Sequence, residues 1–426
     1  MSQLAISTQD KVKDVNLKSK LPQKLQQFMT RGALVKLLML PPAILVVGIF
    51  ILLRPFVIIQ ICKVHDWRIG HMATTTQSIL EVHDWNLTNR RKKIILYFFG
   101  SRYSSNDFLK KLLMRHNYSL QNNWGFLLYF LCAKVSFLIA PTQYQTMDKI
   151  GLFDKYCIPL QFSTEEISVG EEFLSGFGLV PFGKFVCLNV RDDSDLKNQR
   201  GGRHRKFMKH TPRNADISTY LTSAEYLAER GYTVFRMGAS AKDLISSTHS
   251  KVIDYATNGM RTEFLDIYLG AHCGFCISTC SGWDEIPKMF NRQIMFTNII
   301  PILEINVLTR PVLIYPKQLI DLKSNQILNI NDALNMGLAN QSDPYYFQKS
   351  GVGVVDLTSD ELLAAAAEMS ARIEGTFVET PEQKQMQARL KHILSTHPTL
   401  QPTPNYYPIR AEFVSCFLSN NQKFLD

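Results

Sequence analysis

The sequence predicts an α/β fold built on a parallel sheet with helices on both faces. The chain has 426 residues, of which 46% are hydrophobic and 20% are charged, so it is long enough and apolar enough to fold into two domains. In its second half, short apolar runs that end at glycine or polar residues alternate with stretches of helical spacing. Strands that alternate with helices in this way pair in parallel.

The N-terminus carries a basic leader at residues 1–36 and then an apolar segment at residues 37–62, which we expect to attach to a membrane. Residues 37–53 contain no charged residue, a run slightly shorter than the roughly 20 residues that a spanning helix needs. A plain span would put the C-terminal part on the side opposite the leader. Alternatively, Pro41 and Pro42 break the helix, and the segment re-enters or lies in the interface. A buried core helix is the third reading.

The cysteines are read as small buried apolar residues, because most of the eight lie inside apolar runs. This favours a reducing compartment, with folded domains that face the cytoplasm at the inner membrane. Cys273, Cys276 and Cys280 have the spacing C-x2-C-x3-C, which resembles half of a zinc site. The chain has no second C-x-x-C pair to complete four ligands, so we expect no metal there.

A first α/β domain is expected at residues 64–160. It contains a buried strand at 93–100 and an amphipathic helix at 106–116, for which Asn106 is the N-cap. A connector at 161–183 follows. Its helix is opened by the capping box "STEE", residues 163–166, and closed by glycines.

The second domain, residues 184–360, shows the clearest alternation, and a tail at 361–426 follows it. The predicted strands are 185–190, 232–238, 273–279 and 293–298. The predicted helices are 217–231, 261–272 and 283–291, with another at 361–375 in the tail. Pro287 restricts the third helix to a first turn or forces a kink.

Polar residues follow the predicted strands at the sheet edge where open α/β sheets bind ligands. They are Arg191 and Asp192 after the first strand, Arg236, Met237 and Gly238 at the end of the second, and Ser281 and Gly282 after the third. Arginine side chains and turns with free N–H groups suit a diphosphate. Each feature alone is typical of a surface residue or an ordinary turn, so the prediction depends on their convergence.

The loop at 200–216 is strongly basic, and the whole chain carries a formal net charge of +10. We interpret the loop as a flap over a phosphorylated substrate or as a solvated loop. It lacks the aromatic platform of nucleic-acid readers, so no nucleic-acid partner is expected. At its end, Asp216 is placed to cap the helix at 217. The chain contains no phosphate-binding P-loop, no dinucleotide fingerprint and no hydrolase motif.

The motifs "VCLNVRDD", "RNADISTYLTSAEYLAERGYTVFRMG", "VIDYA" and "RTEFLDIYLGAHCGFCISTCSGW" together resemble a family of bacterial glycosyltransferases associated with surface-polysaccharide synthesis. "RIGH" at 68–71 and "FSTEE" in the connector extend the resemblance over about residues 64–310. It implies a GT-B architecture, in which two Rossmann-like domains face a cleft. The N-terminal one, residues 64–160, lies on the acceptor side, and the C-terminal one holds a nucleotide-sugar. It also implies sugar transfer without a metal or another cofactor.

The resemblance also implies which residues bind the donor. These are Arg191, Asp192, Arg213, Asn214, Asp216, Arg236, Met237, Gly238, Asp254, Arg261, Asp266, Ser281 and Gly282. An aromatic residue is expected shortly after Arg191-Asp192 and is missing here, so the basic loop is a local departure.

The expected reaction transfers a hexosyl or related sugar from a nucleotide-sugar to a glycan or lipid-linked acceptor. Basic groups stabilise the leaving diphosphate, and a base deprotonates the acceptor hydroxyl. His71 in "RIGH" is the candidate base, although a structural histidine in a turn is the alternative. Two other functions remain open: a non-catalytic, membrane-bound protein of the same fold, and another phosphate-handling α/β transferase.

Overall fold

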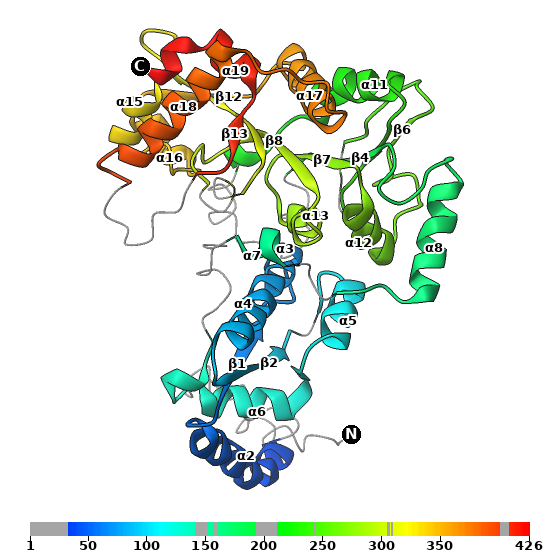
Figure 1. Cartoon of the computed structure of the whole chain (residues 1–426), viewed down its shortest axis with the longest axis vertical. Helices are drawn as coiled ribbons and strands as arrows, with labels where there is room; N and C mark the ends of the chain where they lie inside the picture. Colours follow the sequence, from blue (N-terminus) through cyan, green and yellow to red (C-terminus); the bar gives the residue numbers. More distant parts are fainter. Residues whose placement is uncertain are drawn as a thin grey trace, which may run out of the picture. The chain divides into compact units, whose positions relative to one another are not determined.

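The computed structural model describes residues 33–101, 103–140, 151–156, 160–192, 211–239, 241, 243–304, 307, 310–400 and 409–426. Residues 1–32 of the predicted leader (1–36), residues 200–210 of the basic loop (200–216) and the preceding residues 193–199 lie outside the described residues. The chain forms two compact units (Figure 1). The first unit comprises residues 1–63, 89–100 and 118–140, and the second comprises 64–88, 101–117 and 141–426.

The first unit is a small sheet with two apolar helices. Its strands, in the order β1-β2-β3, are Val57–Val64, Lys92–Phe99 and Ser119–Leu120, and β2 and β3 pair in parallel. Its helices are α2, Ala33–Leu53, α6, Asn122–Cys132, and the 3₁₀ turn η2, Ser136–Leu138. β2 confirms the strand predicted at 93–100.

The segment predicted to attach to a membrane, residues 37–62, is part helix and part strand. α2 runs through Pro41 and Pro42, and the chain then enters β1 at Val57. Within the described part of the chain, no helix qualifies by length and hydropathy as a membrane span. The prolines therefore do not end the helix, and residues 57–62 belong to the sheet because their extended backbone pairs with β2.

The first helices of the second unit come from sequence segments before and after β2. They are α3, Ile69–Ala73, α4, Thr75–Thr88, α5, Asp107–Arg115, α7, Leu152–Lys155, and α8, Thr164–Ser175. The N-caps predicted for α5 and α8 are confirmed. The Asn106 side chain accepts a hydrogen bond from the Leu109 N–H at 2.7 Å, and Ser163 forms a capping box with Glu166. Much of the predicted first domain, 64–160, therefore groups with the second sheet.

A seven-stranded sheet in which every neighbouring pair is parallel forms the centre of the second unit. Its order is β13-β9-β8-β7-β4-β5-β6. The strands are β4, Phe185–Asn189, β5, Thr233–Arg236, β6, Val252–Ile253, β7, Phe275–Ser278, β8, Gln293–Ile299, β9, Leu313–Pro316, and β13, Glu412–Phe413. The parallel sheet predicted from the alternation is confirmed, and its central strands are almost wholly buried.

Helices cover both faces of this sheet, as predicted. Figure 1 shows α11, Leu221–Glu229, and α17, Ser359–Ile373, on one face, and α12, Glu263–His272, and α13, Glu285–Met289, on the other. The predicted helix at 217–231 starts as a 3₁₀ turn, η5, Ile217–Tyr220, and Asp216 caps it as expected by accepting from the Ser218 N–H at 2.9 Å. The predicted helix at 283–291 shrinks to the turn η6, Gly282–Asp284, and the five residues of α13.

The remaining elements of the second unit are a small sheet and further helices. A small antiparallel sheet consists of β10, Gln318–Asp321, β11, Gln326–Ile327, and β12, Val352–Val355. The other elements are η4, Thr211–Arg213, α15, Ile330–Asn335, α16, Pro344–Lys349, α18, Pro381–Thr396, α19, Ser415–Asn420, and η7, Gln422–Leu425.

The cysteines of the central strands lie in the core. Cys187 in β4 pairs directly with Cys276 in β7, and Cys273 and Cys280 at the ends of β7 are buried as well. Burial raises the pKa of the Cys280 thiol to about 11, so this thiol stays protonated near neutral pH. The prediction that these residues pack a central strand is confirmed. Among the described residues, no cluster of histidine, cysteine or acidic side chains is arranged to hold a metal ion.

Candidate functional site

The sheet reverses its strand order between β4 and β7. The chain runs outward from β4 through β5 to β6 and then returns to the other side of β4 as β7. Ligands of open α/β sheets bind at such a switch point, beyond the carboxyl ends of the strands. Arg191 and Asp192 leave β4 here, and the Arg191 N–H donates to the Thr279 hydroxyl at the end of β7 at 2.8 Å. The fold therefore places Arg191 beside the end of β7, just before Ser281 and Gly282.

The turn at Ser281 and Gly282 closes on itself through a capping box. The Asp284 carboxylate accepts from the Ser281 N–H, and the Ser281 hydroxyl accepts from the Trp283 N–H at 3.3 Å. The N–H groups of Ser281 and Trp283 are therefore already bonded within the turn. Of the two predicted donor-binding residues, Gly282 is exposed and Ser281 is half-buried.

Beneath this turn lies a buried polar cluster that the sequence analysis missed. Asp284 is fully buried and accepts from the Ser278 hydroxyl and from the Asn189 amide, the latter at 2.9 Å. The same amide also donates to the Ser281 hydroxyl at 2.7 Å. Burial raises the pKa of Asp284 to about 6, although these donors and the nearby Lys288 oppose the shift. In the sequence, Asp284 could have been found from "SGWD", where an acidic residue follows Ser281 by three positions, the spacing of a capping box.

Arg213 and Asn214 tie together the ends of three strands. The Arg213 guanidinium donates to the Cys280 carbonyl after β7 at 2.6 Å. The Asn214 side chain accepts from Arg191 Nε after β4 at 3.3 Å. The Asn214 carbonyl accepts from Lys317 Nζ after β9 at 2.6 Å. The predicted "RNAD" motif therefore gathers basic side chains at the carboxyl edge of the sheet.

Lys317 is the second residue that the sequence analysis missed. It follows β9 directly, so the rule that polar residues after parallel strands line a site would have found it. Its side chain is buried and forms an ion pair with Asp356. Burial lowers the pKa of this ammonium group, and the ion pair opposes that shift.

Two further predicted donor-binding residues, Arg236 and Asp254, form an ion pair inside the unit. Arg236 is 2% exposed, and it donates to the Asp254 carboxylate at 3.3 Å and to the Asp243 carbonyl at 2.9 Å. Met237 is buried, and Gly238 has φ +148°, a backbone conformation that favours glycine. In this arrangement, the pair organises the turn after β5.

Arg261 and Asp266 form a second pair, at the start of α12. The Arg261 guanidinium donates to the Asp266 carboxylate at 2.6 Å, and the Tyr255 hydroxyl donates to the same carboxylate at 3.3 Å. Burial raises the pKa of Asp266 to about 6. The Asp266 carbonyl also accepts from the Trp283 indole at 3.0 Å, which links this pair to the turn at the switch point.

His71 lies in α3, which packs against η6 and α13. The preceding Gly70 meets the backbone of Gly282 so closely that a methyl group on it would lie 2.8 Å from the Gly282 Cα and carbonyl oxygen. Burial and the positive charge of Arg68 lower the pKa of His71 to about 4, whereas Glu285 opposes the shift. The imidazole is therefore neutral near pH 7, and its Nε2 accepts a hydrogen bond from the Arg68 guanidinium at 3.3 Å.

The predicted residues thus form three local groups rather than one. Arg191, Arg213, Asn214, Ser281 and Gly282 meet at the switch point. Asp192 adjoins them in sequence, and Asp216 caps η5. The ion pairs of Arg236 with Asp254 and of Arg261 with Asp266 make up the other two groups.

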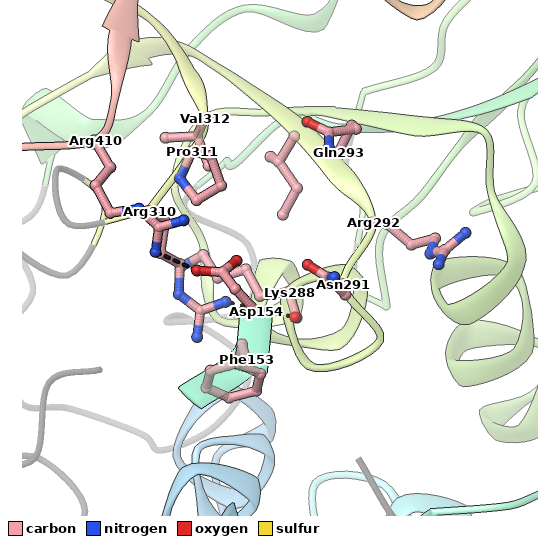
Figure 2. A pocket seen from close by; sticks show the side chains of 11 residues that line it. Phe153, Asp154, Lys288, Asn291, Arg292, Gln293, Arg310, Pro311, Val312 and Arg410 are labelled. Atoms are coloured by element: carbon pink, nitrogen blue, oxygen red, sulfur yellow. Dashed lines mark hydrogen bonds and ion pairs between the residues drawn. The ribbon is translucent and has the colours of Figure 1, made fainter. Parts of the chain in front are cut away.

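A pocket elsewhere in the second unit lies at the opposite ends of the strands. Figure 2 shows its lining, which includes Gln293 at the start of β8 and Val312 just before β9. Arg410 forms an ion pair with Asp154 across it, and the Arg310 guanidinium stacks 4.0 Å from the Phe153 ring. Because this is the amino end of the sheet, the pocket is distinct from the candidate site.

No family model matches the chain, and no curated protein matches it. Among solved structures, the chain is similar to the glycosyl transferase family 9 protein from Veillonella parvula DSM 2008, with 12% identity and a TM-score of 0.34, over 57% of this chain and 81% of that one. It is also similar to E. coli ADP-heptose lps heptosyltransferase II, with 14% identity and a TM-score of 0.31, over 56% and 84%. TM-scores this low assign neither the fold nor the activity of this chain.

Proposed function

We propose that this protein is a glycosyltransferase that moves a hexosyl or related sugar from a nucleotide-sugar to a glycan or lipid-linked acceptor in surface-polysaccharide synthesis. The ordered motifs over residues 64–310 support this proposal through their resemblance to such enzymes. The donor would lie at the carboxyl edge of the seven-stranded sheet, where β4 and β7 diverge.

The observation that carries the proposal is the convergence of Arg191, Arg213 and Lys317 at this edge. Residues 213 and 214 hold the ends of β4, β7 and β9 together. Arg213 Nε is buried and has no hydrogen-bond partner among the described residues, so no protein group satisfies this N–H. A leaving nucleoside diphosphate gains negative charge in the transition state, and fixed cations lower its energy without needing a metal.

The proposal gives different roles to the remaining residues. His71 is the candidate base, because its imidazole is neutral near pH 7 and the residue lies in α3, which packs against η6. The pair of Arg236 with Asp254 holds the turn after β5, and Asp266 with Arg261 supports the turn at Trp283. These two ion pairs therefore stabilise the fold around the site and do not contact the donor themselves.

The first test is binding of UDP-, GDP-, ADP-, dTDP- and CMP-sugars to the full chain by calorimetry, followed by detection of the released nucleotide. At least one donor should bind, and Arg213→Gln should weaken binding about tenfold, since a charge-assisted hydrogen bond contributes about 1.5–3 kcal/mol. Arg230→Gln is the matched control, because Arg230 is half exposed and pairs only loosely with Glu374 at 3.7 Å. If no donor binds, or if both variants lose affinity equally, the proposed donor site is overturned.

The hydrogen bonding within the turn at Ser281 and Gly282 supports a second candidate function. The N–H groups of Ser281 and Trp283 are occupied by Asp284 and the Ser281 hydroxyl, and Gly282 touches Gly70. This arrangement favours a non-catalytic protein that binds a nucleotide or glycan without transfer. Donor binding with no nucleotide release, for any acceptor lipid or glycan extract, would support this candidate over the enzyme.

A further inference from the structure

Helix α2 carries a continuous exposed apolar surface. Leu38, Leu45 and Leu52 are 70%, 65% and 75% exposed and lie seven residues apart, so they share one side of the helix. A second row beside them comprises Leu37, Ile44 and Ile51, also exposed. We call these two rows the α2 apolar face. An apolar face of this extent marks a surface that binds a partner.

The opposite side of α2 is packed inside the first unit. Ala43 is fully buried and Val47 nearly so, and both belong to a core with Leu127 and Leu128 of α6 and Ile61 of β1. Figure 1 shows α2 lying beside α6, as their contacts require. The helix is therefore already held by the fold on one side, and only the α2 apolar face is available for a partner.

The described residues of the first unit carry charge of a single sign. The described residues of the first unit contain no aspartate or glutamate, and their basic residues are Lys36, Arg54, Lys63, Arg90, Arg91, Lys92, Lys93 and Lys134. The Arg91 side chain donates to the Arg54 carbonyl at 3.4 Å, so the basic start of β2 meets the C-terminal end of α2. An apolar surface bordered by cations is complementary to an anionic lipid surface.

The prolines favour a shallow position over a span. Pro41 and Pro42 have no N–H, so the carbonyls of Leu37 and Leu38, four residues earlier, receive no helical hydrogen bond from them. Such carbonyls are costly in hydrocarbon, whereas water reaches them at the headgroup level. The open sheet that packs on α2 also cannot enter the hydrocarbon region.

We propose that α2 lies in the plane of an anionic bilayer, with the α2 apolar face inserted at the boundary between headgroups and acyl chains. The neighbouring cations, Arg54 and Arg90 to Lys93, bind lipid phosphates. This surface belongs to the first unit and is separate from the candidate site, so the inference goes beyond the proposed function. It also decides between the in-plane and spanning arrangements that the sequence leaves open.

The test is co-flotation of the full chain with vesicles of phosphatidylcholine alone or with about one third phosphatidylglycerol. The chain should bind the anionic vesicles at least tenfold more tightly. The triple variant Leu38→Glu, Leu45→Glu, Leu52→Glu should lose at least tenfold in affinity, because three charges enter the apolar boundary. The matched control is Leu244→Glu with Val378→Glu, whose side chains are 63% and 84% exposed in the second unit and should not affect binding.

A second variant separates the charge contribution. Arg90→Gln, Arg91→Gln, Lys92→Gln should weaken binding to anionic vesicles and reduce its dependence on salt, while leaving weak binding to phosphatidylcholine unchanged. Equal binding of wild-type and triple-glutamate chains overturns the proposal. A soluble dimer that the triple-glutamate substitution dissociates would also overturn the proposal, because a second copy of the chain would then cover the α2 apolar face. Nucleotide-sugar binding should be equal in all of these variants, so failure here is distinct from failure of the proposed donor site.

The depth of the helix distinguishes in-plane from spanning α2. Fourteen residues separate Leu38 from Leu52, which is about 21 Å along a helix. Environment-sensitive fluorophores on Leu38→Cys and Leu52→Cys should be quenched to the same extent by headgroup-level quenchers if α2 lies in the plane. A graded difference along the helix would show a span and overturn the in-plane arrangement.

Discussion

Gly70 and Gly282 are in backbone contact, although they lie more than 200 positions apart in the sequence: a methyl group on Gly70 would stand 2.8 Å from the Cα and the carbonyl oxygen of Gly282. This contact joins "RIGH" to the turn that follows β7. The buried Asp66 holds the chain just before it, because its carboxylate accepts from Lys110 Nζ at 3.1 Å and from the Ser101 N–H at 3.2 Å. The position of His71 thus depends on a glycine at position 70.

Gly70→Ala should lower the free energy of unfolding by about 1–3 kcal/mol, because neither backbone has room for the added carbon. Gly176→Ala is the control: its added carbon would lie 3.4 Å from the nearest atom, which is ordinary contact, and its backbone is helical. The control should stay within about 0.5 kcal/mol of the wild type in urea unfolding. Equal effects of the two substitutions would show that the contact between Gly70 and Gly282 is not rigid.

Asp284 should make stability depend on pH between about 4 and 6. Burial raises its pKa to about 6, so within this range the folded chain holds a proton that the unfolded chain has released. Stability therefore falls as the pH rises through this range, by on the order of 3 kcal/mol in total.

Asp284→Asn should flatten this part of the curve of unfolding free energy against pH. The buried Asp266 also has a pKa of about 6, but it is present in both proteins, so the difference between the two curves isolates Asp284. Parallel curves for wild type and variant would contradict the buried, protonated state.

Arg236→Met should destabilise the fold by about 3–5 kcal/mol, because it leaves the Asp254 carboxylate without its buried partner. Arg230→Met, at a half-exposed position, should cost less than about 1 kcal/mol. Thermal unfolding measures both, and donor titration at low temperature should give unchanged affinity for the Arg236 variant. A stable Arg236 variant that has lost donor affinity would instead place this guanidinium on the ligand.

Structural features that depend on one segment of the chain were predictable from the sequence, and contacts between distant segments were not. Strand ends, helix caps and the parallel sheet were predictable, because apolar runs and residues such as Asn106 and Asp216 act through their own segments. The pairing of Arg236 with Asp254 was not, since each residue alone fits a strand end or a ligand site. Nor was the three-way link through Asn214, because its partners leave strands whose order only the folded sheet defines.

His71 should control the acid side of the pH profile if it is the base of the proposed transfer. A base must be unprotonated, and burial together with Arg68 lowers the pKa of His71 to about 4. The value of kcat/KM should therefore fall only as the pH drops through about 4, well below the usual histidine range of about 6.5.

Variants around His71 test this assignment. Arg68→Gln removes a positive charge that lowers the pKa, so the acid limb should move to higher pH; Glu285→Gln removes the opposing negative charge and should move it lower. His71→Gln should reduce kcat by about 10²–10⁴-fold, while the exposed His83→Gln keeps wild-type activity. The assignment is contradicted if Arg68→Gln leaves the acid limb unchanged and His71→Gln keeps full activity. His71 would then have a structural role beside Gly282, and another side chain would be the base.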